Sequence, residues 1–400
     1  MIRDKIFWLR IFKYLPDTMT TRLLLSTLIL QMSLACNCND TKEQGQNPDV
    51  EILYVMPAES EVHEGTWLQW PHQYQYGILY RNSLDPTWIA MTSALVSDEN
   101  VHIIAYNQTE KERITSLLTS NNIPLTNVTF RIYKTDDVWV RDNGPIFVRD
   151  KKGTLTIQDW GFNGWGNKID DISGQMIQSA NCNAIPTKIG SDIGVPLVDL
   201  NLMMINEGGS IEIDGHGTMM ACKSSILNKN RNPNMNQGLV EAIFRQNLGI
   251  TKFIWLDGQE GLDVTDQHID GFARFGNANT IVTMETNDLL DFDVKPSDIQ
   301  NLFAAKDKDG KAYSFIKVPL SKNNVVTTTG KNLGYKGSYV NYYIGNQKVL
   351  VPNYNDPHDI IANAKIQALY PTRTVIGIDV RNLYANGGMV HCVTQQQPTK

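Results

Sequence analysis

Residues 136–145 read DDVWVRDNGP and concentrate three aspartates and one arginine within seven positions. Two runs rich in β-branched and aromatic residues, Thr129–Tyr133 and Ile146–Arg149, flank the stretch and predict strands. Any one carboxylate here is typical of an acidic turn with a local Asp–Arg pair. Trp139 and Asp142 lying together between two apolar strands are less typical of a turn, so the stretch predicts a polar site where the strands break.

Working outward, more strands are predicted along the chain by the same residue types. These runs are Val101–Tyr106, Leu155–Trp160, Ile281–Met284, Tyr339–Ile344, Lys348–Val351 and Thr374–Ile378. Helical patterns lie between some of them, so the chain predicts the α/β class, although without a regular parallel βαβ rhythm. Five units of about 70 residues would fit the length, but spacing alone does not show a repeat.

Three helix starts can be read from capping residues. Asp85-Pro86 and Asp356-Pro357 each place an N-cap residue before a proline, which is favoured at the first helical position. Residues 236–248 form a third amphipathic candidate, which Gly249 is expected to end.

The overall composition narrows the class of protein. Hydrophobic residues make up 42% and charged residues 20% of the 400 residues, as in a packed soluble protein. The net charge of −6 disfavours a nucleic-acid partner, because nucleic-acid binders carry clustered Lys and Arg. No Walker A segment and no G-x-G-x-x-G between a strand and a helix occur. Cys-x-x-Cys and H-E-x-x-H are also missing from the sequence, so we expect no metal site.

The N-terminus differs from the rest of the chain. Basic residues precede an apolar run of thirteen residues, Leu23–Ala35, which is too short to span a bilayer as a helix. Residues 1–35 therefore predict a secretory leader, starting at Met1 or at Met19.

The segment before Cys36, Ser33-Leu34-Ala35, resembles a bacterial lipoprotein processing site, although the large aliphatic residue usually stands where Ser33 is. We therefore expect an exported protein, periplasmic or attached to a membrane through a lipidated Cys36. The alternative is an uncleaved extension on a cytoplasmic protein. Residues 36–50 are polar and predict a linker, which leaves 51–400 as one large folded domain.

Glu207 begins a second polar cluster, Glu-Gly-Gly-Ser at 207–210. The two glycines allow another backbone to approach closely, and residues 214–217 predict a hairpin turn just beyond. The alternative for Glu207 is an exposed residue at a bulge.

A third cluster contains His268 and Asp270. On an extended strand, side chains two positions apart point to the same face, so the pair predicts an acid/base unit or two metal ligands. The alternative is a buried histidine that simply pairs with a nearby aspartate.

The fourth cluster surrounds Cys392, which lies in a short β-like run after a glycine pair. An isolated buried cysteine is usually an inert small hydrophobe. A single cysteine with His and Asp elsewhere in the chain is, however, the pattern of a nucleophile. Cys182 and Cys222 lack such neighbours in the sequence and are expected to be structural.

Taken together, the ordered clusters resemble the agmatine deiminase and bacterial-type peptidylarginine deiminase family, within the guanidine-modifying superfamily. The resemblance runs from about Met56 to Pro398. The matching segments are Met56–Glu59, His63–Trp67, Trp70–His72, Asp136–Pro145, Trp160–Gly166, Glu207–Ser210, Asn230–Pro233, His268–Asp270, Ser338–Tyr343 and His391–Pro398. The resemblance implies a five-bladed α/β propeller of ββαβ-like units around a central active-site pocket, without a metal or organic cofactor.

The resemblance also implies roles for individual residues. Cys392 would be the nucleophile, His268 the acid and base, and Glu207 the group that orients His268. Asp142 and Asp270 would hold the substrate guanidinium, whose planar fork of N–H donors suits two carboxylates. Trp139 would pack over the guanidinium or its alkyl stem. These roles predict a hydrolase that converts a guanidine to a ureido group and ammonia.

Agmatine is the favoured substrate, because the segments around Glu207, Tyr339 and Gln395 look more like agmatine deiminases. The arginine side chain of a peptide is the alternative, and it would suit an exported protein. A non-catalytic guanidinium- or polyamine-binding surface module is an alternative of another class, against which the complete set of chemical residues weighs. The sequence departs from the family at Gln267, Gly271 and Met389, and residues 167–173 look short for agmatine deiminases.

Overall fold

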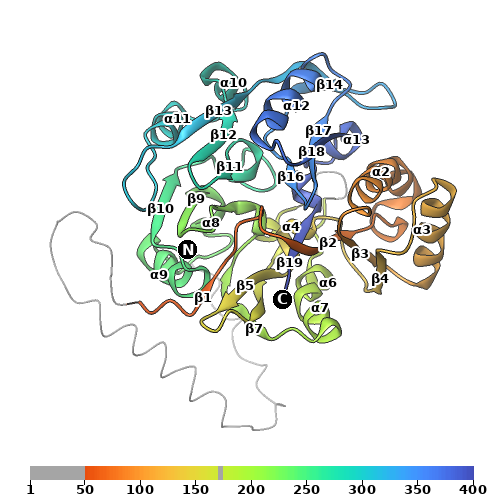
Figure 1. Ribbon diagram of the computed structural model, residues 1–400, viewed down its shortest axis with the longest axis horizontal. Helices are drawn as coiled ribbons and strands as arrows, with labels where there is room; N and C mark the ends of the chain where they lie inside the picture. Colours follow the sequence, from red (N-terminus) through yellow and green to blue (C-terminus); the bar gives the residue numbers. More distant parts are fainter. Residues whose placement is uncertain (1–49, 170–173) are drawn as a thin grey trace, which may run out of the picture. The chain divides into compact units, whose positions relative to one another are not determined.

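The β-structure forms six sheets in the described residues, which are 50–169 and 174–400 of a computed structural model (Figure 1). The strands are β1 (Tyr54–Val55), β2 (His63–Gln69), β3 (Asn100–Ala105), β4 (Val128–Ile132), β5 (Ile146–Asp150), β6 (Leu155–Gly161), β7 (Leu197–Ile205), β8 (Ile211–Ile213), β9 (Thr218–Cys222), β10 (Lys252–Leu256), β11 (Arg274–Asn277), β12 (Thr280–Met284), β13 (Ser314–Val318), β14 (Leu320–Val326), β15 (Asn332–Ser338), β16 (Tyr343–Ile344), β17 (Lys348–Asn353), β18 (Thr374–Asp379) and β19 (Gln395–Pro398).

Helices connect the strands, and three short 3-10 turns lie among them. The helices are α2 (Gln73–Leu95), α3 (Gln108–Ser120), α4 (Val140–Asn143), α5 (Gly164–Asn167), α6 (Ala180–Asn183), α7 (Ile185–Ile193), α8 (Lys223–Ile226), α9 (Gln237–Leu248), α10 (Thr286–Asp291), α11 (Pro296–Phe303), α12 (His358–Leu369) and α13 (Arg381–Tyr384). The 3-10 turns are η1 (Gly208–Ser210), η2 (Ile269–Gly271) and η3 (His391–Val393). These three turns position the site described below.

Five of the sheets in the described residues repeat one arrangement. An antiparallel pair of strands is followed by helical residues and then by a strand parallel to the second of the pair. The five strand sets are β5-β6-β7, β8-β9-β10, β11-β12-β13, β16-β17-β18 and β19-β2-β3. The predicted mixed α/β class is therefore confirmed. Since each set combines antiparallel with parallel pairing, the sequence has no uniform βαβ rhythm.

The fifth set joins two distant parts of the chain. Strand β19 pairs with β2, with Gln395 opposite Trp67, and the Trp67 indole donates a hydrogen bond to the Gln397 side chain at 2.9 Å. All four residues of β19 are buried, although three of them are glutamines. The buried amides need partners in the protein, so this pairing fixes the strand that begins three residues after Cys392.

Most of the predicted strands and all three predicted helices are confirmed, although one of the helix starts is wrong. Helix α9 begins after Asn236, whose side chain accepts the backbone N–H of Leu239, and it ends at Gly249 with a φ of 75°. Helix α12 follows Asp356-Pro357 as expected, and Asp356 accepts the N–H of His358.

The predicted helix start at Asp85 is wrong, because α2 begins at Gln73 and contains Pro86. Asp85 is not available as a cap, since its carboxylate accepts hydrogen bonds from the Trp70 indole at 2.7 Å and from Arg113 at 2.6 Å. Gly77, with a φ of 83°, breaks the helical geometry near its start.

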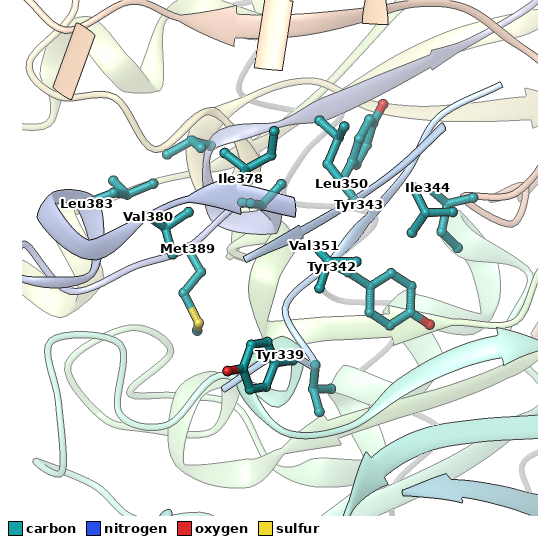
Figure 2. Close-up of a cluster of buried hydrophobic side chains, with 14 of the residues drawn as sticks. Tyr339, Tyr342, Tyr343, Ile344, Leu350, Val351, Ile378, Val380, Leu383 and Met389 are labelled. Carbon is teal, nitrogen blue, oxygen red and sulfur yellow. The ribbon is translucent and has the colours of Figure 1, made fainter. Parts of the chain in front are cut away.

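The strand predicted at Tyr339–Ile344 is also wrong for most of its length. Strand β15 ends at Ser338 and β16 begins at Tyr343, so a turn lies between them. Consecutive side chains of this turn are all fully buried, which the alternation of a half-buried strand does not allow. Figure 2 shows these tyrosines in the core with Met389, and this packing supports the chain that leads to Cys392.

The described residues belong to one unit, Asp49–Lys400. None of the helices described is long and apolar enough to cross a membrane. The predicted leader at 1–35 and nearly all of the linker at 36–50 lie outside the described residues, so both stay predictions.

Candidate active site

Three short turns and helix α4 bring the predicted chemical residues together. Cys392 lies in η3, Asp270 lies in η2 directly after His268, and Asp142 lies in α4. Cys392, His268, Asp142, Asp270 and Trp139 all line one cavity of about 2090 Å³. Glu207, which precedes η1, is only 1% exposed and lies behind His268.

His268 is held from behind by a buried carboxylate. Its Nε2 lies 2.7 Å from Glu207 Oε2, and the other Glu207 oxygen accepts a hydrogen bond from Arg231 Nε at 2.7 Å. Arg231 is in turn bound to Asp266 at 2.6 Å. Because an ionised carboxylate only accepts, Nε2 carries the hydrogen, and Nδ1 faces the cavity side, 3.6 Å from Asp142 Oδ1.

Asp142 is oriented by two neutral donors. The backbone N–H of Gly209 donates to Oδ1 at 3.1 Å, and the indole of Trp165 donates to Oδ2 at 2.9 Å. Neither donor cancels the carboxylate charge, so Asp142 remains suited to a cationic ligand.

Asp270 is oriented by a different chain of contacts. His391 Nδ1 lies 2.8 Å from Asp270 Oδ2, while His391 Nε2 lies 2.8 Å from Glu59 Oε2. Glu59 also accepts hydrogen bonds from Arg274 and Arg141. Burial raises the pKa of Asp270, but the contact with His391 outweighs it, and the net pKa is lowered. The second carboxylate is therefore kept ionised.

Cys392 is the one partly exposed thiol among the three free cysteines of the described residues. Its Sγ lies 3.5 Å from Asn341 Oδ1 and 3.9 Å from Asp270 Oδ2. Burial, together with the charges of Asp270 and Asp142, raises the pKa of the thiol well above its usual value. Without a bound cation the sulfur is thus protonated at neutral pH.

The pKa values of His268 and Asp142 both rise. Burial lowers the pKa of His268, but the carboxylates of Asp142 and Glu207 outweigh it and raise the value to about 9. Burial raises the pKa of Asp142 to about 6, although the charge of His268 opposes this. At pH 7 to 8 the site therefore holds an imidazolium beside a carboxylate.

The predicted strand at His268–Asp270 is wrong. His268 is extended, but Ile269–Gly271 is a 3-10 turn, and the two residues before His268 are left-handed, with φ values of 60° at Asp266 and 70° at Gln267. A glycine would adopt such a φ without strain, and position 267 is one of the places where the sequence was expected to depart from the family pattern. The two side chains meet in one cavity through this turn and not through strand alternation.

Several residues of the site were not assigned roles from the sequence. Trp165 lies in a glycine-rich segment, and the simplest interpretation of that segment is a tight turn with stacked side chains. It does contact Phe162 edge-on at 5.2 Å, but its indole also binds Asp142. Four more residues of the site could be suspected only because they lie in segments that carry the family resemblance; they are Glu59, Arg231, Asn341 and His391.

Gly209 lies between the side chains of Asp142, His268 and Asp270, and its lack of a side chain leaves the space between them free. A Cβ at Gly209 would lie 2.7 Å from both Asp142 Oδ1 and His268 Nδ1, and 3.1 Å from Asp270 Oδ2. Such contacts are too short, so any side chain here would displace Asp142, His268 or Asp270.

We expect Gly209→Ala to lower kcat/KM by about 100-fold or more, because small displacements of reacting groups are costly. Steady-state ammonia release measures the effect. The matched control is Gly271→Ala in η2, where the added methyl would meet only the Phe292 ring, at 3.5 Å. Equal activity of the two variants would contradict the view that the space at Gly209 must stay free.

In the described residues, no three His, Cys, Asp or Glu side chains are arranged to hold a metal ion. The prediction of a cofactor-free reaction stays a prediction.

Comparison with known proteins agrees with the geometry. The sequence pattern of the Porphyromonas-type peptidyl-arginine deiminase family matches residues 55–398. Agmatine deiminase of Ectopseudomonas mendocina is 30% identical over 376 residues, which cover 86% of this chain and 95% of the relative.

Two solved structures are also similar. One is C. jejuni agmatine deiminase, a cysteine-to-serine variant with substrate bound, with 25% identity and a TM-score of 0.72 over 90% of this chain and 99% of that one. Agmatine deiminase of Enterococcus faecalis, at 24% identity, shares the fold with a TM-score of 0.73 over 90% of this chain and 100% of that chain.

A cavity that presents a thiol, a histidine and two carboxylates on this mixed α/β fold defines a guanidine-deiminating hydrolase. The chain belongs to the Porphyromonas-type peptidyl-arginine deiminase family, which confirms the resemblance inferred from its sequence.

Proposed function

We propose that the protein hydrolyses agmatine to N-carbamoylputrescine and ammonia, with Cys392 as the nucleophile. The observation that carries the proposal is the placement of one partly exposed thiol beside two buried carboxylates in a single cavity. Relatives that are named agmatine deiminases and share most of their length with the chain support the choice of substrate.

Binding would depend on charge pairing. Asp142 and Asp270 would each accept hydrogen bonds from an edge of the guanidinium, and Trp139 would flank it. The bound cation would also favour the thiolate of Cys392, because it offsets the two negative charges that raise the pKa of the thiol. Substrate binding would thus activate the nucleophile, and the thiol would release its proton to solvent.

The first chemical step would form a covalent intermediate. The thiolate of Cys392 would attack the guanidinium carbon and give a tetrahedral adduct. His268, protonated at neutral pH, would donate its Nδ1 proton to one terminal nitrogen, and the C–N bond would break to release ammonia. An amidino-thioether on Cys392 would remain.

In the second step, water would attack the amidino carbon, and His268 would now accept a proton from that water. Collapse of the adduct would break the C–S bond, regenerate Cys392 and leave the ureido product. Glu207 would keep the His268 ring in place during both transfers.

Peptidyl-arginine is the second candidate substrate, and the exposed apolar side chains that line the cavity favour it. Leu79, Met176 and Tyr335 line the cavity although they are 83%, 54% and 48% exposed. An apolar mouth of this kind could accept residues that flank an arginine.

Parallel assays of ammonia and of ureido product would test the substrate. They should use agmatine, free arginine, and peptides with internal or C-terminal arginine. We expect the highest kcat/KM with agmatine. Turnover of peptides alone would replace agmatine by the second candidate, and no product from any of them would leave a non-catalytic binding module.

Two features around the site also belong to the proposal. The five repeated strand sets support a five-bladed propeller around the cavity. The basic and apolar composition of residues 1–35 supports export, with Cys36 as the residue that could carry a lipid. Mass spectrometry of the untagged protein from its native host would decide this, since an N-terminus at Met1 would exclude cleavage.

The pH dependence follows from the two raised pKa values. We expect kcat/KM to fall below about pH 6, where Asp142 becomes protonated, and above about pH 9, where His268 loses the proton it must donate. The folded-state pKa of His268 lies above its unfolded value of about 6.5, so its stabilising contribution is complete below that pH and is lost as the pH rises through about 9. A rate profile without a basic limb would contradict the assignment.

A further inference from the structure

A third carboxylate in the same cavity has no part in the chemistry above. Asp137 lines the cavity with Cys392 and is 8% exposed. Its side chain accepts hydrogen bonds from Tyr76 at 2.9 Å, from Tyr80 at 3.2 Å and from the backbone of Val138 at 2.8 Å. All of these donors are neutral, and no Lys, Arg or His within the described ranges forms an ion pair with Asp137.

An uncompensated carboxylate at this burial is costly, and a cationic ligand would offset that cost. The surroundings suit an alkylammonium group. The rings of Tyr76 and Tyr80 lie 4.8 Å apart beside the carboxylate, and aromatic faces attract cations. Burial raises the pKa of Asp137 to about 6, which agrees with the missing positive charge.

The indole of Trp139 lies between Asp137 and the loop that carries Cys392. Its side chain hydrogen-bonds to Asp137 at one end, while a Cβ at Gly388, four residues before Cys392, would overlap its six-membered ring at the other. Asp137 and the loop of the nucleophile thus lie at opposite ends of one indole. A butyl chain is about as long as an indole, so a substrate could extend along Trp139 and reach both.

The charges that line the cavity also favour a cationic substrate. Among the described lining residues, Asp137, Asp142, Asp263 and Asp270 carry carboxylates, and His268 supplies the opposing positive charge. The other two charged residues of the described lining, Lys168 and Asp379, are paired with Asp266 and Arg381. This excess of negative charge favours a substrate with two positive charges and disfavours one that carries a carboxylate beside its stem.

We propose that Asp137 binds the terminal ammonium of the substrate and so makes the enzyme selective for guanidines that carry a second cation on a short alkyl chain. The inference rests on the proposed function and adds its specificity determinant. Asp142 and Asp270 would hold the guanidinium at one end of the substrate, and Asp137 would hold the ammonium at the other.

Two substrates that differ only in the ammonium test the proposal with the full-length protein. Agmatine carries the group, and n-butylguanidine ends in a methyl at the same place. The wild-type protein should have a kcat/KM at least about 30-fold higher for agmatine, because a buried charge pair is lost with the analogue. In Asp137→Asn the value for agmatine should fall at least tenfold, while that for n-butylguanidine should change by less than about threefold.

The matched control is Asp379→Asn, which removes another carboxylate from the cavity lining. Asp379 is already paired with Arg381 at 2.8 Å, so the preference for agmatine should stay at the wild-type value. The second variant Asp137→Glu keeps the charge and should retain part of the preference.

An equal loss for both substrates in Asp137→Asn would mean a structural role through the tyrosines and would overturn the inference. A wild-type protein that turns over both substrates equally well would also overturn it while leaving the proposed function intact, and this comparison does not depend on how the variants fold. No ureido product from either substrate would refute the proposed function itself, and the inference with it.

Discussion

Replacing Cys392 by alanine is expected to lower kcat by about 10⁴-fold or more, since the covalent path requires the sulfur and no other cysteine is among the described residues that line the cavity. The fold should persist. Cys392 is the partly exposed cysteine of the three described, and it lies in η3, outside the β19–β2 pairing that fixes the strand after it. Ammonia release measures the loss, and near-UV circular dichroism checks the fold.

Cys222→Ala is the matched control for this prediction. Cys222 is fully buried, and burial raises the pKa of its thiol, so it should be chemically inert. That variant should keep its kcat and lose only some stability. Persistent ammonia release by Cys392→Ala would remove this residue from the mechanism.

Replacing His268 by alanine should lower kcat by about 10³- to 10⁴-fold, because both proton transfers pass through its ring. The basic limb near pH 9 should vanish from whatever activity remains, since that limb reports the proton on His268. A merely structural histidine would leave the shape of the pH profile unchanged. The measurement is therefore kcat/KM between pH 5 and pH 10 for the variant and the wild-type protein.

The control for His268 is His216→Ala. His216 is exposed in the hairpin turn between β8 and β9 and does not line the cavity of Cys392. It should leave both the rate and the pH profile unchanged. Wild-type kinetics in His268→Ala would refute the acid and base role.

The chemical residues could be predicted from the sequence because each lies in a short cluster of unusual composition. Cys392, His268 and Asp142 are therefore found by motif and resemblance alone, and the structure brings them to one cavity. Their mutual geometry could not be predicted in the same way. Alternation along a strand suggested how His268 and Asp270 meet, whereas a left-handed turn at Asp266 and Gln267 brings them together.

The residues that support the site could not be predicted from the sequence for a different reason. His391 and Glu59 are 332 positions apart, and their contact depends on the pairing of distant segments. Gly209 carries no side chain, so its importance lies in the space that it leaves free. The local pattern predicts a helix cap at Asp85, because it does not reveal the indole of Trp70 that donates a hydrogen bond to this carboxylate.

The pairing of β19 with β2 has a consequence for synthesis. Residues 63–69 leave the ribosome early, but their antiparallel neighbour at 395–398 is made more than 320 residues later. At a synthesis rate of about 5–20 residues per second, β2 lacks this partner strand for at least about 15 seconds after its own synthesis. Cys392, the proposed nucleophile, is translated in the same late stretch. A nascent chain therefore lacks this residue until shortly before its last sheet can be completed, and a chain interrupted before residue 392 would both lack the proposed nucleophile and be exposed to aggregation along that edge.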